Sequence, residues 1–132
     1  MLKPVLNRWD WLEISPDPVF EGLTTCIAGA GYVPQIEDRV AELTLGGPLI
    51  LQREPWNPYD DRAIVVLSPQ GCKLGYIPRR RNQRLARELD QGRQFSVTLT
   101  AIDGAQSGWP QLTVRIMSRN EGFLSSSQTS MA

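Results

Sequence analysis

The side chains best suited to ligand binding lie in the segment Asn57-Pro58-Tyr59-Asp60, where Pro58 and the nearby Pro55 restrict the backbone. This set suits a nucleoside, because the ring of Tyr59 can stack on a base and the carboxylate of Asp60 can accept a hydrogen bond from a sugar hydroxyl. The amide of Asn57 adds a donor and an acceptor. The alternative is a structural turn, in which Asp60 binds main-chain N–H groups and Tyr59 covers one end of the fold.

A second feature is a cluster of basic residues at positions 73–93. This stretch holds seven basic and two acidic residues, a net charge of +5, although the whole chain has a net charge of zero. Arg79, Arg80 and Arg81 stand at the start of a predicted helix, where cations oppose the helix dipole. This conflict favours a nearby phosphate or carboxylate. The alternative is a solvent-exposed face with ion pairs such as Arg84–Glu88.

Aromatic residues form the third feature, since several of them fall at the ends of predicted strands or in loops: Tyr32, Trp56, Tyr59, Tyr76 and Trp109. Aromatic side chains at such positions can stack on the bases of a single strand. Packing at the rim of the core is the alternative for at least half of them.

Catalytic and metal sites are not expected. The chain has no histidine and only two cysteines, so it lacks a four-ligand zinc set. The adjacent carboxylates of Asp60 and Asp61 point to opposite sides of an extended segment, and no glycine-rich phosphate loop is present. Cys26 and Cys72 are predicted to be buried free thiols. Without a secretory segment or a long apolar run, the chain is expected to be cytoplasmic, with no membrane contact and no cofactor.

The elements that position these residues predict a mainly β fold of one domain. Strands are expected at 23–29, 48–53, 63–67, 72–77, 94–102 and 111–117, with one principal helix at 79–91 and a short second helix within 36–44. Together they predict a small six-stranded OB-like or SH3-like barrel. We expect an N-terminal extension at residues 1–22, the domain at 23–121 and a disordered tail at 122–132.

The segment from Arg53 to Arg79 resembles the signature of the HIRAN domain. The matching positions are Arg53-Glu54-Pro55, Asn57-Pro58-Tyr59-Asp60, Ala63-Ile64, Val66 and Gly75-Tyr76-Ile77-Pro78-Arg79. The resemblance extends over roughly residues 23–120. It implies an OB-like barrel, found as a stand-alone bacterial protein and at the N-termini of DNA-remodelling helicases.

In the helicase-linked members, the resemblance implies a site for the 3′ end of single-stranded DNA. Asp60 then accepts the terminal 3′-hydroxyl, Tyr59 stacks on a base, Asn57 and Tyr32 belong to the same pocket, and Arg79 contacts a phosphate. One position differs, because Gly31 stands where DNA-binding members carry a basic residue. Arg80 or Arg81 is the expected replacement for that charge, and Trp109 is the expected closing aromatic residue.

We therefore predict a monomeric, non-enzymatic module that binds single-stranded DNA 3′ ends in DNA repair or replication. The alternative is a protein–protein adaptor that uses the barrel as a scaffold, with Trp9, Trp11 and Phe20 as its docking surface. The sequence leaves open the choice between DNA and RNA, the sequence preference and the pathway.

Overall fold

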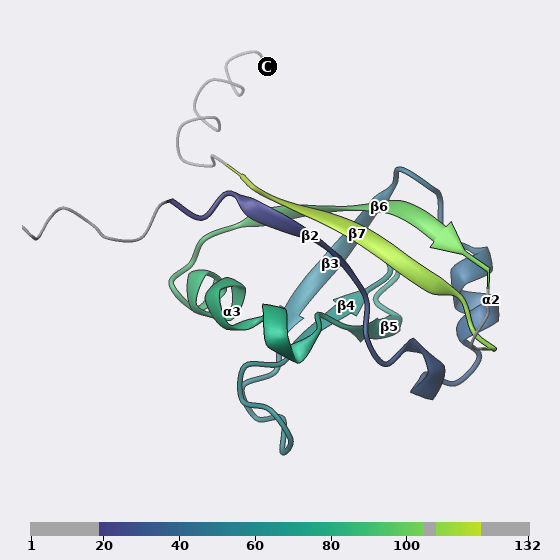
Figure 1. Cartoon of the computed structure of the whole chain (residues 1–132), viewed down its shortest axis with the longest axis horizontal. Coiled ribbons are helices and arrows are strands. Elements are labelled where there is room, and N and C mark those ends of the chain that lie inside the picture. Colours follow the sequence, from purple (N-terminus) through teal and green to yellow (C-terminus); the bar gives the residue numbers. More distant parts are fainter. Residues whose placement is uncertain (1–18, 105–107, 120–132) are drawn as a thin grey trace, which may run out of the picture.

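Six antiparallel strands curl into a half-barrel in the computed structural model, which describes residues 19–104 and 108–119 (Figure 1). The strand order in the sheet is β2-β7-β6-β3-β4-β5. The strands are β2 (Gly22–Cys26), β3 (Pro48–Arg53), β4 (Ile64–Leu67), β5 (Lys73–Tyr76), β6 (Phe95–Asp103) and β7 (Gln111–Ser118). The predicted fold class is confirmed. The expectations for residues 1–18 and 122–132 lie outside the described residues.

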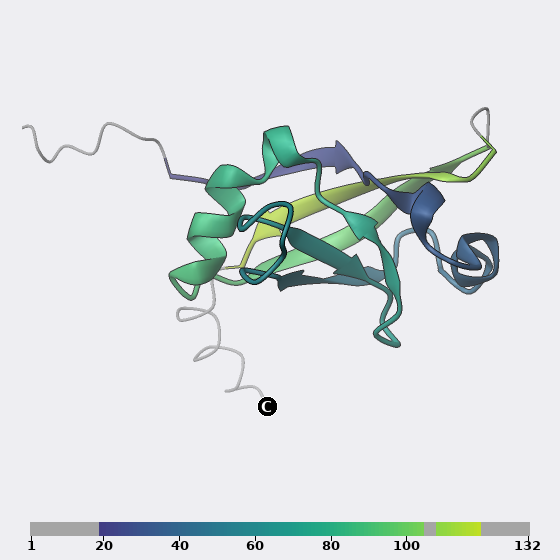
Figure 2. The same ribbon diagram turned by 90° about the horizontal axis from the view of Figure 1, so that it is seen from below.

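Within the described residues, four short helical segments connect the strands and lie at the open ends of the sheet (Figures 1 and 2). They are η1 (Ala30–Tyr32), α2 (Ile36–Ala41), η2 (Arg79–Arg81) and α3 (Gln83–Asp90). The principal and the short second helix were both predicted. Among the described residues, no helix has the length and apolar character needed to cross a bilayer.

The core lies inside the curve of the sheet. Strand β6 alternates between the two faces, so that Val97 and Leu99 are buried against Val114 and Ile116 of β7. Strand β4 lies between β3 and β5 in the sheet, and three consecutive residues of it, Ile64, Val65 and Val66, are buried, as its unbroken apolar run predicts. These contacts hold the two ends of β4, and therefore the loop before it, in a fixed place.

One end of the half-barrel is closed by two hydrogen bonds beyond β2. The N–H of Ala28 donates to the carbonyl of Tyr76 at 2.8 Å, and the N–H of Tyr76 donates to the carbonyl of Ala28 at 2.8 Å. Gly75 permits this approach, because a Cβ there would lie 2.4 Å from Cγ2 of Ile27 and 2.6 Å from the carbonyl oxygen of Ala28. The glycine of the Gly75-Tyr76 motif is thus required by barrel closure.

The predicted helix at 79–91 is divided at Asn82, so that the three arginines form the 3₁₀ turn η2 and the α-helix begins at Gln83. Leu85 and Ala86 are buried, as their spacing predicts. Glu88 is also buried and accepts hydrogen bonds from Arg84 at 3.1 Å and Arg93 at 2.7 Å. The helix is therefore held to the barrel by an ion-pair network as well as by apolar contacts.

The prediction that both cysteines are buried is wrong, because Cys26 and Cys72 are exposed free thiols. Cys26 follows the buried Thr25 on the edge strand β2, so alternation directs its side chain outward. Cys72 follows the turn at Gly71, ahead of β5. Phe20, part of the alternative docking surface, packs against the core with its ring 5.7 Å from that of Phe95.

Candidate nucleic-acid interface

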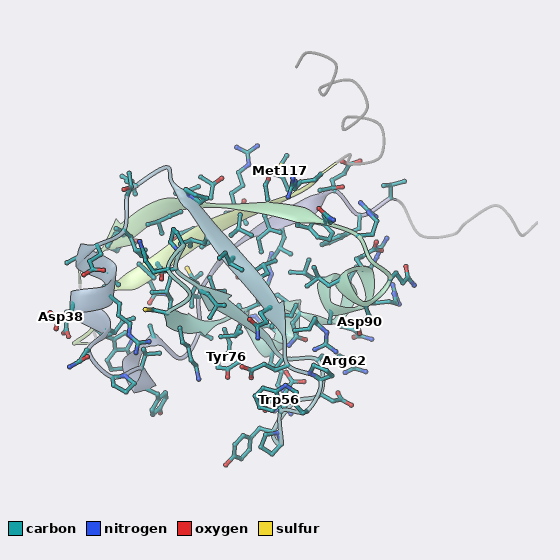
Figure 3. The ribbon with its side chains drawn as sticks, turned by 180° about the vertical axis from the view of Figure 1, so that it is seen from behind. Asp38, Trp56, Arg62, Tyr76, Asp90 and Met117 are labelled. Carbon is teal, nitrogen blue, oxygen red and sulfur yellow. The ribbon has the colours of Figure 1, made fainter. Side chains whose placement is uncertain are left out.

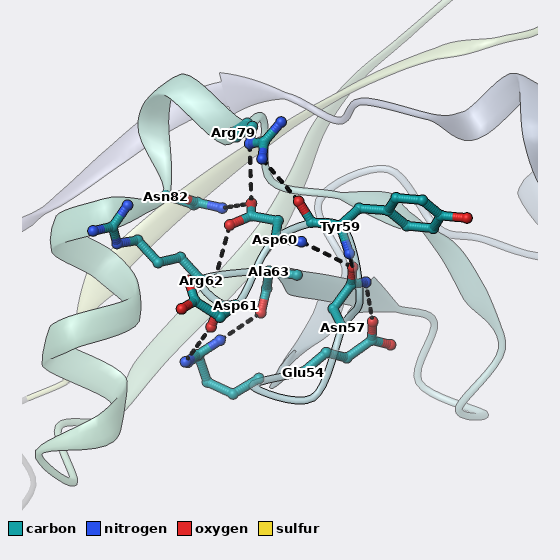
Figure 4. Close-up of polar contacts among 10 residues, drawn as sticks. Glu54, Asn57, Tyr59, Asp60, Asp61, Arg62, Ala63, Arg79 and Asn82 are labelled. Atoms are coloured by element: carbon teal, nitrogen blue, oxygen red, sulfur yellow. Dashed lines mark hydrogen bonds and ion pairs between the residues drawn. The ribbon is translucent and has the colours of Figure 1, made fainter.

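The loop between β3 and β4 is built around the side chain of Asn57 (Figure 4). Its Oδ1 accepts hydrogen bonds from the N–H groups of Tyr59 at 2.8 Å and Asp60 at 3.2 Å. Its Nδ2 donates to Oε1 of Glu54 at 3.0 Å. The structural-turn interpretation expects Asp60 to bind main-chain N–H groups, and Asp60 does accept one from Arg62. Asn57 has the larger structural role, since its contacts occupy much of its hydrogen-bonding capacity.

Two neighbouring side chains tie this loop to the barrel. Glu54 is buried and accepts a second hydrogen bond from Oη of Tyr76 on β5, at 2.8 Å. Arg53 donates to the carbonyls of Ala63 at 2.8 Å and Asp61 at 3.0 Å, and pairs with Asp90 of α3 at 2.9 Å. The loop is thus fixed from both sides before any ligand arrives.

Asp60 lies where the loop meets the start of α3. Its Oδ1 accepts a hydrogen bond from the N–H of Arg62 at 2.9 Å, and its Oδ2 accepts one from Nδ2 of Asn82 at 2.9 Å. Nε of Arg79 lies 3.9 Å from the same Oδ2. Because a carboxylate offers about four acceptor positions, these contacts leave acceptor capacity unused. The Asp60 side chain retains 18% of its exposure, so a ligand can reach it.

These contacts also keep Asp60 ionised. Burial disfavours the charged form, but the hydrogen bonds from Arg62 and Asn82, together with the charges of Arg79 and Arg62, outweigh it and hold the pKa of Asp60 below its ordinary value. Asp60 is therefore a hydrogen-bond acceptor rather than a donor at neutral pH.

A pocket of about 460 Å³ opens beside Asp60, between the loop and the helical segments. Arg79 connects the helical segment η2 to the loop, because its Nη2 donates a hydrogen bond to the carbonyl of Tyr59 at 2.8 Å. The pocket brings together five of the predicted site residues with five others: Asn57, Tyr59, Asp60, Arg79 and Arg80, with Pro58, Asp61, Arg62, Asn82 and Gln83. Sequence reasoning missed Asn82, whose side chain contacts Asp60.

The Tyr59 ring is 83% exposed and points away from the Asp60 carboxylate in Figure 4. The alternative interpretation, in which this ring covers the end of the barrel, is wrong. Trp56, in the same loop, is 70% exposed and lies far from Asp38 on α2 (Figure 3). Both rings have free faces on which a base could stack.

Tyr32 and Trp109 do not line this pocket. Tyr32 ends η1 and is 92% exposed. Trp109 precedes β7 and covers Gly31: a Cβ at Gly31 would lie 2.7 Å from Cδ2 and Cε2 of the indole. The indole therefore occupies the space in which a basic side chain at position 31 would begin, which explains the glycine there. Tyr32 and Trp109 form a second aromatic feature beside η1.

No group of three or more Cys, Asp or Glu side chains that could hold a metal ion occurs in the described part of the chain. The site instead offers an acceptor, exposed rings and guanidinium groups, which suits a ligand with hydroxyl, aromatic and anionic parts.

The HIRAN domain family model matches residues 23–119 of the chain. A crystal structure of a protein from Lactobacillus plantarum is 36% identical, covers 74% of this chain and 95% of its own, and superposes with a TM-score of 0.62. The crystal structure of the HIRAN domain of human HLTF is 23% identical, covers 76% of this chain and 78% of its own, and has a TM-score of 0.57, a likeness of fold. No curated protein matches the sequence.

Proposed function

Because this chain belongs to the HIRAN domain family, a family of nucleic-acid-binding modules, we propose that it binds the 3′ end of single-stranded DNA without catalysing a reaction. The observation that carries the proposal is the ionised Asp60 carboxylate at the wall of an open pocket. A terminal 3′-hydroxyl can donate a hydrogen bond to this carboxylate. A 3′-phosphate replaces this donor with a negatively charged group, which the carboxylate repels.

The surroundings of Asp60 fit the rest of a terminal nucleotide. The exposed ring of Tyr59 offers a stacking surface for a base, and such stacking contributes about 1–3 kcal/mol for each base. Arg79 and Arg80 line the pocket and suit the phosphate that joins the terminal nucleotide to the preceding one. Asn57 has a positioning role, because its hydrogen bonds hold Tyr59 and Asp60 in place.

The proposal is tested by fluorescence anisotropy with 5′-labelled oligonucleotides that end in a 3′-hydroxyl or a 3′-phosphate. We expect tighter binding of the hydroxyl end, and weaker binding of that end by Asp60→Ala and Tyr59→Ala. The matched control is Asp38→Ala, since Asp38 is an exposed acid on α2 and lies away from the loop (Figure 3). Equal affinity of the wild-type protein for both ends would contradict the proposal.

A further inference from the structure

We infer that the strand whose 3′ end occupies the pocket continues along a second, arginine-lined groove, which binds its upstream phosphates. The groove has a volume of about 280 Å³ and is lined by Arg80, Arg81, Gln83, Arg84 and Arg87. This inference rests on the proposed function, because it assigns the path of the same ligand beyond its terminal nucleotide.

The pocket and the groove are adjacent. Arg80 and Gln83 line both of them, so a chain that leaves the pocket past these two residues enters the groove directly. Arg84 and Arg87 lie about one turn apart on α3, and Arg80 lies in the 3₁₀ turn η2 that precedes the helix. With a rise of about 1.5 Å for each residue in an α-helix and about 2.0 Å in a 3₁₀-helix, the stretch extends over roughly 10–12 Å. This length accommodates two or three successive phosphates.

The positive charge of the groove is only partly neutralised within the described residues. Of the two acids of the same helix, Glu88 pairs with Arg84 of the groove and with Arg93, and Asp90 pairs with Arg53. Neither Arg80 nor Arg87 makes an ion pair or a side-chain hydrogen bond to the described part of the chain. Both are exposed, so their guanidinium groups are available to a ligand.

The residues at the start of α3 also favour the binding of an anion. Three arginines precede the helix, its first turn contains no acidic residue, and Asn82 at the N-cap makes no capping hydrogen bond with its side chain. Cations at a helix N-terminus are unfavourable, and phosphate groups relieve that cost. A polyanion with several phosphates fits a groove lined by four arginines better than a single small anion does.

The experiment compares a 5′-labelled trinucleotide with a 12-nucleotide strand, both with 3′-hydroxyl ends, at several salt concentrations. The variant Arg81→Gln/Arg87→Gln changes two residues that line only the groove. We expect this variant to bind the long strand several-fold more weakly than the wild type does. The slope of log affinity against log salt concentration should become shallower by about 1.4, which corresponds to two lost phosphate contacts. The affinity for the trinucleotide should equal that of the wild type. The control is Arg115→Gln, an exposed arginine on β7.

Three outcomes overturn the inference: an unchanged affinity for the long strand, an equal loss for both lengths, or a variant that loses binding of poly-glutamate while DNA binding stays intact. The last outcome would assign the groove to an acidic protein segment. Failure of the proposed function is distinguishable, because the wild-type protein would then bind 3′-hydroxyl and 3′-phosphate ends equally. Thermal melting of each variant confirms that it is folded.

Discussion

The side-chain amide of Asn82 donates a hydrogen bond to Oδ2 of Asp60 at 2.9 Å and so joins the β3–β4 loop to the start of α3. Asn82 is 2% exposed, and its contact spans 22 positions of sequence. It fixes the carboxylate relative to the arginines of η2, which are adjacent to Asn82 in the chain. The acid and the phosphate-binding groups of the proposed site therefore belong to one rigid unit.

Replacement of Asn82 tests whether this contact holds the unit together. Asn82→Ala removes a buried donor to a charged acceptor, which destabilises a protein by about 1–3 kcal/mol. We expect a loss of that size in the free energy of unfolding, measured by urea denaturation. The control is Gln83→Ala, because Gln83 is exposed. Equal stability of Asn82→Ala and the wild type would show that the hydrogen bond is unimportant.

Asp60 should make stability depend on pH. Its pKa is lower in the folded state than in the unfolded chain, where it is about 3.9. Its contribution to stability is therefore fully present above that value and is lost as the pH falls through the lower, folded-state pKa. We expect the wild type to lose more unfolding free energy than Asp60→Asn does between pH 6 and about pH 2. Parallel pH profiles for the two proteins would contradict this prediction.

Much of the fold could be predicted from the sequence, because its signals are local. Alternation in β6 and β7, the apolar run of β4 and the spacing of Leu85 and Ala86 each depend on residues close in the chain. The prolines near Asn57 likewise marked a constrained loop. The family resemblance then indicated which side chains in that loop to examine.

The contacts that complete the candidate site could not be predicted this way, because they join distant segments. Asn82, where the helix is divided, contacts Asp60 from 22 positions away in the sequence, and Gly31 packs against Trp109 from the segment before β7. The apolar neighbours of Cys26 favour a place in the core, but alternation along β2 buries Thr25 and directs Cys26 outward. Patterns among neighbouring residues do not indicate contacts between segments that are distant in the sequence.

Arg53 should control the rigidity of the loop. Its side chain is largely buried and donates to two carbonyls of the loop, so Arg53→Gln should lower the free energy of unfolding by about 1–2 kcal/mol. We also expect faster hydrogen exchange in residues 57–63. The control is Arg62→Gln, whose side chain is exposed. Unchanged exchange in the loop of Arg53→Gln would argue against this role.

The packing of Trp109 on Gly31 predicts that even a small side chain at this position is disruptive. In Gly31→Ala the new Cβ meets the indole, so we expect a loss of about 1–3 kcal/mol in unfolding free energy. The emission of Trp109 should also shift to the red in a protein whose other tryptophans are replaced by phenylalanine. The matched control is Gly104→Ala, where a Cβ meets nothing within 4 Å. Similar behaviour of the two variants would contradict the steric explanation.

The account depends above all on a hydrogen bond between Asp60 and the terminal 3′-hydroxyl, and a thermodynamic cycle measures it directly. Affinities are determined for the wild type and Asp60→Ala, each with a strand that ends in a 3′-hydroxyl and with a matched 3′-deoxy strand. A hydrogen bond to a charged group contributes about 1.5–3 kcal/mol, so removal of the hydroxyl should weaken wild-type binding by about tenfold to a hundredfold. The same removal should leave Asp60→Ala unaffected. An equal effect of the hydroxyl in both proteins would contradict the account.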